Sequence, residues 1–201
     1  MGRRSDHSRT ELRALIVAEA HKHLAEVGFL RFSAREVAKR IGYSIGTIYN
    51  VFGTLDALMI AVNTRTFGLW VDHLGRHLAS AGKDRIEAMV EGYFSFAARN
   101  PNLWMAIYDH RLPHDMTMPE ADARERARLT QMVEAEVAKA LARPTSADIA
   151  VLTRSLVAVV HGHCSFALTG TFNLLGEQNP QGAALARVRE TLAAAKRTAE
   201  L

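Results

Sequence analysis

Hydrophobic and polar residues recur with a helical period along almost the whole chain. The first apolar stripe repeats at intervals of three and four residues and consists of Leu12, Leu15, Ile16, Ala20, Leu24 and Val27. This spacing predicts an amphipathic helix, and Gly28 follows where a helix most easily ends. We expect this helix to supply a core on which the next elements rest.

Residues 33–58 predict two shorter helices, a glycine turn between them and the start of a third helix. Ser33 and Glu36 have the spacing of a capping box, which would begin the first of these helices. Gly42 follows it, and Ser44 can cap the second helix. The two sides of the second helix are apolar (Ile45, Ile48 and Phe52) and small or polar (Gly46, Thr47, Tyr49 and Asn50).

A small or polar outer face is what a helix needs in order to enter the major groove of DNA. Residues 33–58 therefore have the outline of a DNA-binding helix-turn-helix. The alternative is an ordinary pair of short helices in a bundle, but such a pair gains little from an exposed tyrosine.

The remainder of the chain also predicts helices, with few strand signals and no internal repeat. We expect them at about residues 54–81, 84–99, 101–113, 121–142, 145–172 and 183–198, with loops at 112–119 and 176–182. The expected fold class is all-α, with about nine helices. A three-helix domain over residues 1–53 would be joined without a flexible linker to a helical domain over residues 54–201.

Composition and charge narrow the class of protein. Hydrophobic residues make up 48% of the chain and charged residues 23%, with a single cysteine. No apolar run is long enough to span a bilayer, so we expect a soluble cytoplasmic protein without a membrane partner. Residues 1–52 hold nine Lys and Arg against five Asp and Glu, whereas the remainder holds sixteen of each. A basic lobe is typical of a module that contacts phosphates. Arg3 and Arg4 could form an arm that reaches DNA, or simply a solvated tail.

The helix-turn-helix region resembles the TetR family of bacterial transcription regulators. The resemblance rests on Gly28, Phe29, Ser33, Val37, Ala38, Ile41, Gly42, Tyr43, Ser44, Gly46, Thr47, Tyr49 and Phe52. Three positions depart from the family pattern. Ser33 stands where threonine is commoner, Val51 where histidine is frequent, and Leu55 where a lysine is usual. The change at Leu55 removes an expected phosphate contact, which Thr54 and the free amides of the next helix could replace.

The resemblance implies a homodimeric repressor that binds a palindromic DNA operator and is released by a small apolar or amphipathic effector. The candidate DNA contacts are Ser33, Arg35, Ser44, Ile45, Gly46, Thr47, Tyr49, Asn50 and Thr54. Dimerisation is expected through the last two helices, and residues 147–172 are apolar on more than one face, which requires burial on several sides. Within them His161-Gly162 is similar to the Trp-His-Gly of one C-terminal subfamily, with Val160 in place of tryptophan.

The effector site is expected among the aromatic residues of the C-terminal part, because small-molecule pockets are mainly apolar with a few polar groups. The candidates are Phe67, Trp70, Phe94, Trp104, Met105, Tyr108, His161 and Cys164. Trp104 and Tyr108 share one helical face, as do His161 and Cys164. Aromatic residues at helical spacing are more often plain core, and that alternative stays open for each of them.

The sequence carries no motif for catalysis or for binding a cofactor. Two histidine pairs have the spacing of helical metal ligands: His73 with His77, and His110 with His114. Neither pair has a third ligand, so no metal site is expected. His161 and Cys164 could form an activated thiolate or an electrophile sensor, but a mid-helix cysteine in apolar surroundings is usually inert. The alternatives to an effector-controlled regulator are therefore an architectural DNA-binding dimer and a small helical enzyme using these two residues.

Overall fold

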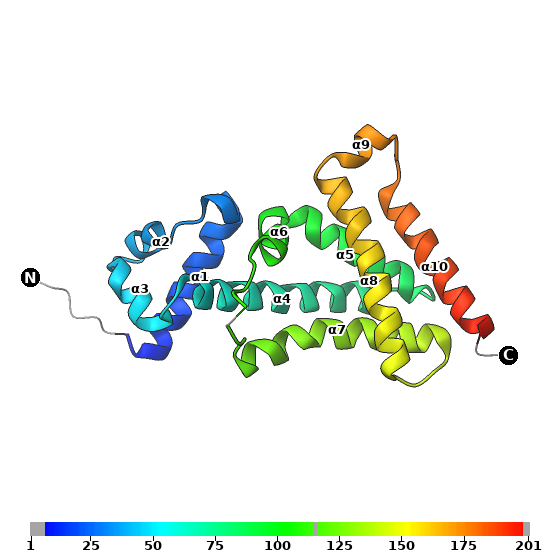
Figure 1. Ribbon diagram of the computed structural model, residues 1–201, viewed down its shortest axis with the longest axis horizontal. Helices are drawn as coiled ribbons and strands as arrows, with labels where there is room; N and C mark the ends of the chain where they lie inside the picture. The colour runs from blue at the N-terminus through cyan, green and yellow to red at the C-terminus, as the bar shows by residue number, and fades with distance from the viewer. Residues whose placement is uncertain (1–6, 115, 199–201) are drawn as a thin grey trace, which may run out of the picture. The chain divides into compact units, whose positions relative to one another are not determined.

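The computed structural model describes residues 7–114 and 116–198. Helices account for 81% of the chain, and the part described contains no strand. The elements are α1 (Arg9–Val27), η1 (Phe29–Arg31), α2 (Ala34–Arg40), α3 (Ile45–Phe52), α4 (Leu55–Ser80), α5 (Arg85–Arg99), α6 (Pro101–Asp109), α7 (Glu120–Leu141), α8 (Ala147–Leu168), α9 (Thr171–Leu175) and α10 (Pro180–Thr198) (Figure 1). The predicted all-α fold class is confirmed.

The helices belong to two compact units. Unit 1 holds the described residues within Met1–Gly68 and Asn100–Glu125, and unit 2 holds those within Leu69–Arg99 and Arg126–Leu201. Unit 1 thus contains α1, α2, α3 and α6, and unit 2 contains α5, α8, α9 and α10, while α4 and α7 contribute residues to both. Helix α6 therefore packs with the N-terminal helices, although it lies about 50 residues after α3.

Helix α1 begins with a capping box that the sequence analysis did not identify. Ser8 Oγ accepts the N–H of Glu11 at 3.3 Å, and the Glu11 carboxylate accepts the N–H of Ser8 at 2.7 Å. The two bonds satisfy amides that have no partner within the helix. The bonds from Ser8 hold the pKa of Glu11 below its ordinary value. The helix ends directly before Gly28, as predicted.

The capping box predicted at Ser33 is only half formed. Ser33 Oγ accepts the N–H of Glu36 at 3.3 Å, but the N–H of Ser33 donates to Nε2 of His23 at 3.3 Å. The Glu36 carboxylate instead accepts from Arg40 Nε at 3.4 Å. His23 lies on α1, so the competing partner comes from the tertiary structure. Helix α2 is still capped and starts where the sequence predicts.

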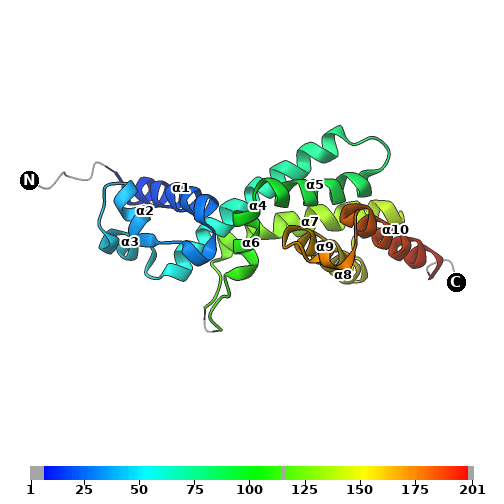
Figure 2. The same ribbon diagram turned by 90° about the horizontal axis from the view of Figure 1, so that it is seen from above.

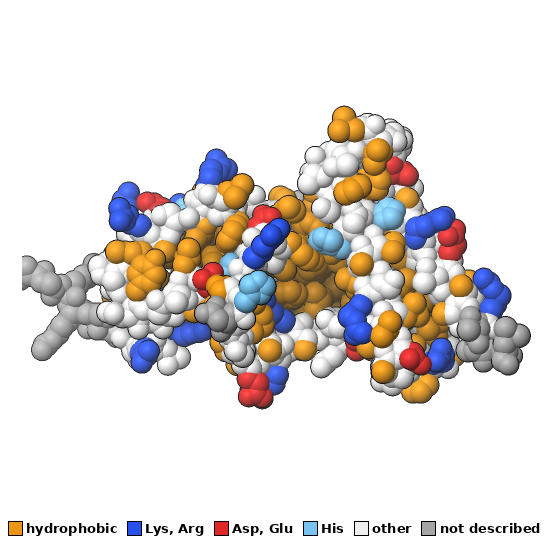
Figure 3. All heavy atoms as spheres, in the orientation of Figure 1, with side chains coloured by type: hydrophobic (Ala, Val, Ile, Leu, Met, Phe, Trp, Pro, Cys, Tyr) orange, Lys and Arg blue, Asp and Glu red, His pale blue; other side chains and the backbone are white. Residues whose placement is uncertain are grey.

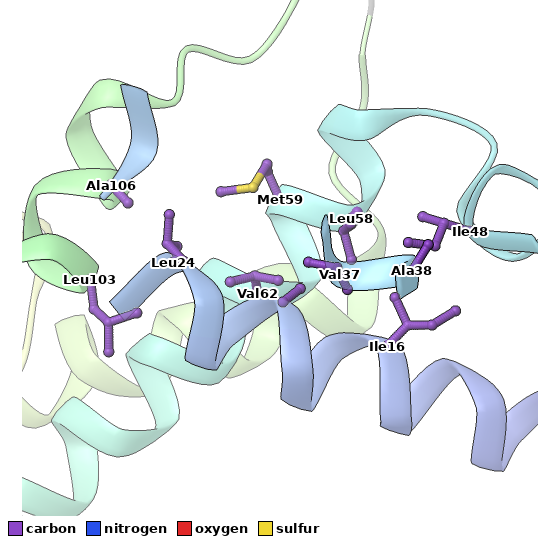
Figure 4. Close-up of a cluster of buried hydrophobic side chains, with 11 residues drawn as sticks. Ile16, Leu24, Val37, Ala38, Ile48, Leu58, Met59, Val62, Leu103 and Ala106 are labelled. Atoms are coloured by element: carbon purple, nitrogen blue, oxygen red, sulfur yellow. The ribbon is translucent and has the colours of Figure 1, made fainter. Parts of the chain in front are cut away.

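Unit 1 has one hydrophobic core, to which α1, α2, α3, α4 and α6 all contribute (Figure 4). Its buried members are Ile16, Ala20, Leu24, Val37, Ala38, Ile48, Leu58, Met59, Val62, Leu103 and Ala106. Ile48 is the one buried residue of the eight-residue α3. A helix this short has little stability of its own, so α3 depends on this core for its position.

Polar contacts also fasten α6 within unit 1. The buried Asn63 on α4 donates its Nδ2 to the carbonyl oxygen of Ala106 at 3.2 Å. Asn102 Nδ2 donates to the carbonyl oxygen of Ala25, on α1, at 2.8 Å. The Ala25 carbonyl lies in the last turn of α1, where main-chain acceptors lack intrahelical partners, and the Ala106 carbonyl also accepts the main-chain N–H of His110. These bonds fix α6 against α1 and α4.

Unit 2 is organised around α8, which packs side by side with α10 and also contacts α5 (Figure 2). An ion pair joins α5 to α7, because Arg85 donates to both carboxylate oxygens of Glu136 at 2.6 and 2.9 Å. Lys139 adds a third bond at 2.8 Å. The bonds from Arg85 hold the pKa of the buried Glu136 below its ordinary value. A buried carboxylate needs such partners in order to remain ionised.

Two helices end earlier than the sequence predicts. Helix α6 ends at Asp109 rather than near residue 113, because His110 leaves the helical backbone. Helix α8 ends at Leu168 rather than near residue 172. Gly170 there adopts a φ of +76°, which turns the chain into the additional short helix α9.

Two helix starts also differ from the predicted ones. Helix α8 is capped by Ser146, whose Oγ accepts the N–H of Ile149 at 3.3 Å, and not by Thr145. Helix α10 begins at Pro180 rather than at residue 183, because Asn179 Oδ1 accepts a main-chain N–H of the first turn at 3.0 Å. A cap followed by proline is a favoured helix start.

Helix α8 has the length and the apolar composition of a membrane span, although only 28% of its most apolar window is buried within the chain. Core helices of globular proteins have the same properties, so this feature alone is weak evidence for a membrane. Its exposed side chains include Val151 and Phe166. An apolar helix with this much exposed surface is typical of a contact with another partner.

The buried His21 should make unit 1 sensitive to acid. Its Nε2 has no hydrogen-bond partner in the part of the chain that the structure describes. Burial and, to a smaller extent, the charge of Arg65 lower its pKa from 6.5 to about 4. Between these values the unfolded chain binds the proton and the folded chain does not. The contribution to stability is therefore complete above about pH 6.5 and is lost as the pH falls toward 4.

We expect this residue to lower the free energy of unfolding by about 2 kcal/mol between about pH 7 and about pH 5. Urea unfolding followed by circular dichroism at both pH values measures the change. The variant His21→Leu should lose most of this pH dependence. The control variant His114→Leu, which changes an exposed histidine, should keep it. Equal pH dependence in the two variants would contradict the assignment to His21.

Candidate DNA-binding surface and effector-binding residues

The turn between α2 and α3 is closed by main-chain and side-chain hydrogen bonds. Gly42 adopts a φ of +76°, and the N–H of Tyr43 donates to the carbonyl oxygen of Ala38 at 2.9 Å. Ser44 Oγ accepts the N–H of Thr47 at 3.3 Å and lies 3.2 Å from Thr47 Oγ1. The cap predicted at Ser44 is thus formed, and it holds the first turn of α3.

The two sides of α3 lie in different environments, as the sequence predicts. Ile48 is buried, and Ile45 and Phe52 are partly buried against the same core. On the other side Tyr49 is 46% exposed, and Asn50 is exposed as well. One side of α3 is therefore anchored in unit 1, and the other is open to a partner.

The remaining candidates for DNA contact lie at helix N-termini nearby. Thr54 is exposed, and its Oγ1 accepts the N–H of Ala57 at 3.1 Å at the start of α4. Leu55, in place of the expected lysine, is 41% exposed. Ser33 is half-buried and caps α2, and Arg35 is exposed on the first turn of the same helix. Gly46 is exposed and Thr47 half-buried on the first turn of α3.

The structure places the start of the described chain beside the turn before α3. His7 Nδ1 lies 3.0 Å from the Tyr43 hydroxyl, and the two rings are 6.4 Å apart. The sequence analysis missed this pair, because no periodic pattern links residues 36 positions apart. The arm predicted at Arg3 and Arg4 lies outside the described residues.

Arg40 is among the basic residues of this lobe that are engaged in ion pairs. Arg40 Nη1 lies 2.8 Å from a Glu26 carboxylate oxygen and 3.3 Å from one of Glu19. The hydrogen bond to Glu26 is the main cause of the raised pKa of Arg40. Both acids lie on α1, so the guanidinium group of Arg40 links α2 to α1.

Half of the effector candidates belong to unit 1: Phe67, Trp104, Met105 and Tyr108. Trp104 is buried and Tyr108 is exposed, with ring centroids 5.1 Å apart. This contact confirms that Trp104 and Tyr108 share one face of α6. Phe67 on α4 and Met105 on α6 are half-buried.

The other half belong to unit 2: Trp70, Phe94, His161 and Cys164. Trp70 is buried, stacks on Phe96 at 5.1 Å, and meets the Tyr93 ring edge-on at 4.9 Å. The Tyr93 hydroxyl lies 3.1 Å from Nδ1 of His161, so α5 and α8 are joined at this point. Phe94 is half-buried. Tyr93 was missed as a candidate, although it precedes Phe96 by three residues and therefore shares its helical face.

The imidazole of this cluster is partly buried. Burial disfavours its charged form and lowers the pKa of His161 below its ordinary value. Neutral donors and acceptors within an aromatic cluster suit a ligand that is apolar or carries a few uncharged polar groups.

Cys164 lies on the buried face of α8. Its side chain is 1% exposed, and burial raises its pKa to about 12. The thiol is therefore protonated at neutral pH and is a poor nucleophile. This environment argues against the activated thiolate that an enzyme using His161 and Cys164 would need.

The first histidine pair has another partner, and the second pair does not share a helix. His73 and His77 both direct Nε2 at Ser95 Oγ, at 2.8 and 3.2 Å. Burial, and then the charge of His77, lower the pKa of His73. His110 and His114 do not share a helix, because α6 ends before them. Across residues 7–114 and 116–198, no three His, Cys, Asp or Glu side chains are grouped to hold a metal ion.

A capped helix with an exposed outer face, preceded by a glycine turn and a second short helix, defines a helix-turn-helix DNA-binding protein. Comparison with protein families supports this class. The family described as "Bacterial regulatory proteins, tetR family" matches residues 16–62, and "Tetracyclin repressor-like, C-terminal domain" matches residues 86–195. The chain belongs to the TetR family and is a DNA-binding transcriptional regulator.

Solved structures share the fold along most of their length. A protein of unknown function from Rhodococcus sp. RHA1 is 20% identical, covering 96% of this chain and 98% of that one with a TM-score of 0.71. A TetR-family regulator from Streptomyces coelicolor is 19% identical, covering 93% and 99% with a TM-score of 0.64. FadR from Bacillus subtilis, solved with stearoyl-CoA, is 15% identical, covering 89% and 96% with a TM-score of 0.60. Comparison with curated protein sequences found no match.

Cys164 should be unreactive towards thiol reagents in the folded protein. Raising the pKa from 9.0 to about 12 lowers the thiolate fraction at about pH 8 by roughly two to three orders of magnitude, and the side chain is also enclosed. We expect almost no reaction of the native protein with a disulfide reagent over minutes, and reaction of the single thiol in guanidinium chloride. Rapid labelling of the native protein would instead identify an accessible, activated cysteine.

Proposed function

We propose that this protein is a homodimeric repressor that binds a palindromic operator and is released from it by a small apolar or amphipathic effector, in the cytoplasm. The observation that carries the proposal is the position of α3, which is anchored through Ile48 while Tyr49 and Asn50 are exposed. Residues 1–53 serve DNA binding in this proposal, and residues 54–201 serve effector binding and dimerisation.

The DNA contacts fall into two groups. Phosphate contacts are assigned to Ser33, Thr47, Tyr49 and Thr54, with Arg35 and Ser44 beside them. Base contacts are assigned to Ile45, Gly46 and Asn50. Exposed helix N-termini support this assignment, because their free amides attract phosphates. Two such α3 helices in a dimer would enter successive major grooves about 34–36 Å apart.

Dimerisation is assigned to α8 and α10, the last two long helices. Their side-by-side packing leaves apolar residues of α8 exposed, among them Val151 and Phe166. Hydrophobic side chains are also visible on the surface of α9, which connects these two helices (Figure 3). Leu174 on α9 is 89% exposed. Covering such surface with the same helices of a second subunit would remove it from water, which contributes about 25 cal/mol per Å².

Effector binding is assigned to the candidates of α4, α5, α6 and α8 named in the sequence analysis, with Tyr93 added from the structure. The hydrogen-bonded pair of Tyr93 and His161 beside Trp70 supports an uncharged or amphipathic ligand. The stearoyl-CoA in the Bacillus subtilis FadR structure is an amphipathic ligand on the same fold. An effector lowers operator affinity only by its different affinity for the two states of the protein.

Selection of bound duplexes from a random DNA pool, at near-physiological salt, tests the proposal. Enrichment of an inverted repeat, together with a dimer mass in sedimentation, is the expected result. The enriched duplex then serves as the probe in a screen for compounds that release it. A folded protein that enriches no sequence, or only an asymmetric one, would contradict a symmetric operator-binding dimer.

Tyr49→Ala should weaken binding to every duplex, because a phosphate contact carries no sequence information. We expect a loss of about tenfold, measured by fluorescence anisotropy on the selected duplex and on an unrelated one. Tyr49→Phe is the matched control, since it keeps the ring and removes only the hydroxyl. Full affinity in Tyr49→Ala would remove this residue from the interface.

Asn50→Ala should change the preferred sequence more than the overall affinity. A side-chain amide reads base edges in the major groove, and one such contact discriminates by about 1–3 kcal/mol. Repeating the selection with the variant measures the effect, with Arg35→Ala as a control that should weaken binding without changing the motif. An identical motif from Asn50→Ala would exclude base recognition by this residue.

A further inference from the structure

A hydrogen bond within unit 1 joins the end of α6 to the first turn of α4. His110 Nε2 lies 3.0 Å from Asp56 Oδ1. An ionised carboxylate can only accept, so the imidazole N–H is the donor. The side chain of His110 is 5% exposed and that of Asp56 is 38% exposed. His110 is thus the buried member of the pair, and Asp56 is the partly exposed group to which it donates a hydrogen bond.

His110 is itself held firmly. Its ring centroid lies 5.8 Å from that of Phe29, on η1. Its main-chain N–H donates to the carbonyl oxygen of Ala106 at 3.2 Å. The same carbonyl accepts from the buried Asn63, at 3.2 Å. His110, the partner of Asp56, is therefore held in place by contacts with α4, α6 and η1.

Asp56 occupies a sensitive place. It follows Thr54, whose hydroxyl caps α4, by two residues, and α3 ends at Phe52. Any shift of this turn moves both Thr54 and the free amides beside it. A carboxylate at this point would by itself repel a DNA phosphate.

We propose that His110 is a positioning residue for DNA binding. Its hydrogen bond to Asp56 holds the first turn of α4 in the orientation in which Thr54 and the neighbouring amides meet a phosphate. The inference rests on the proposed function and deepens it, because it assigns a role in operator binding to a residue that does not face DNA.

Replacing Asp56 separates positioning from simple electrostatics. Asp56→Ala removes a negative charge, which alone would tighten binding to DNA. Positioning predicts the opposite, a loss of about tenfold in affinity for the selected duplex. Asp56→Asn keeps an acceptor for His110 and should bind at least as tightly as the wild-type protein. Glu120→Ala, which breaks an exposed ion pair with Arg124 on α7, is the charge-matched control and should leave affinity unchanged.

His110→Ala should reproduce the loss, and the double variant with Asp56→Ala should be no weaker than either single variant. The slope of log affinity against log salt should fall by about one phosphate contact in both single variants. Reduced stability alone would not change this slope. Urea unfolding in the assay buffer establishes that each variant is folded. If His110→Ala does not fold, the contrast between Asp56→Ala and Asp56→Asn carries the test.

The outcomes distinguish the two proposals. In one outcome, the wild-type protein binds the duplex and Tyr49→Ala weakens this binding, but Asp56→Ala binds as tightly as the control. The positioning role of His110 is then overturned, and the proposed function stands. If the wild-type protein and Tyr49→Ala bind all duplexes equally weakly, the proposed function fails and this inference fails with it.

Discussion

The attachment of one short helix to a shared core is the constraint on which this structure depends. Helix α3 has eight residues, too few to be stable alone in water. Ile48 fixes it, buried against residues such as Ile16, Val37 and Leu58. Burying one such side chain contributes about 1.5–3 kcal/mol. The exposed residues of α3 are therefore placed by apolar residues that never face a partner.

The same core explains why α6 belongs to unit 1. Leu103 and Ala106 complete its apolar surface, and Asn63 and Asn102 tie the helix down through main-chain carbonyls. Polar bonds of this kind have strict geometry, so they fix the position of α6 as well as its contact. Unit 1 thus includes a segment that begins at residue 100.

Unit 2 contains two kinds of polar site, one charged and one uncharged. The buried Glu136 stays charged because Arg85 and Lys139 bond it, and it joins α5 to α7. His161, which lies beside Tyr93 among aromatic rings, is instead held neutral by burial, which lowers its pKa. A charge in low dielectric requires a partner, whereas neutral groups can exchange partners at lower cost. The first arrangement suits a structural link, and the second suits a site for a ligand.

The sequence by itself determined the features that depend on neighbours three or four positions apart: the helical period, the caps at Ser33 and Ser44, the two sides of α3 and the family resemblance. It misplaced the end of α8 and the start of α10, where Gly170 and Asn179 act locally and their signals were overlooked. Only the tertiary structure decided which distant groups meet, as with His23 at Ser33 and His110 at Asp56. Such pairs leave no periodic trace, because their distance depends on how whole helices pack.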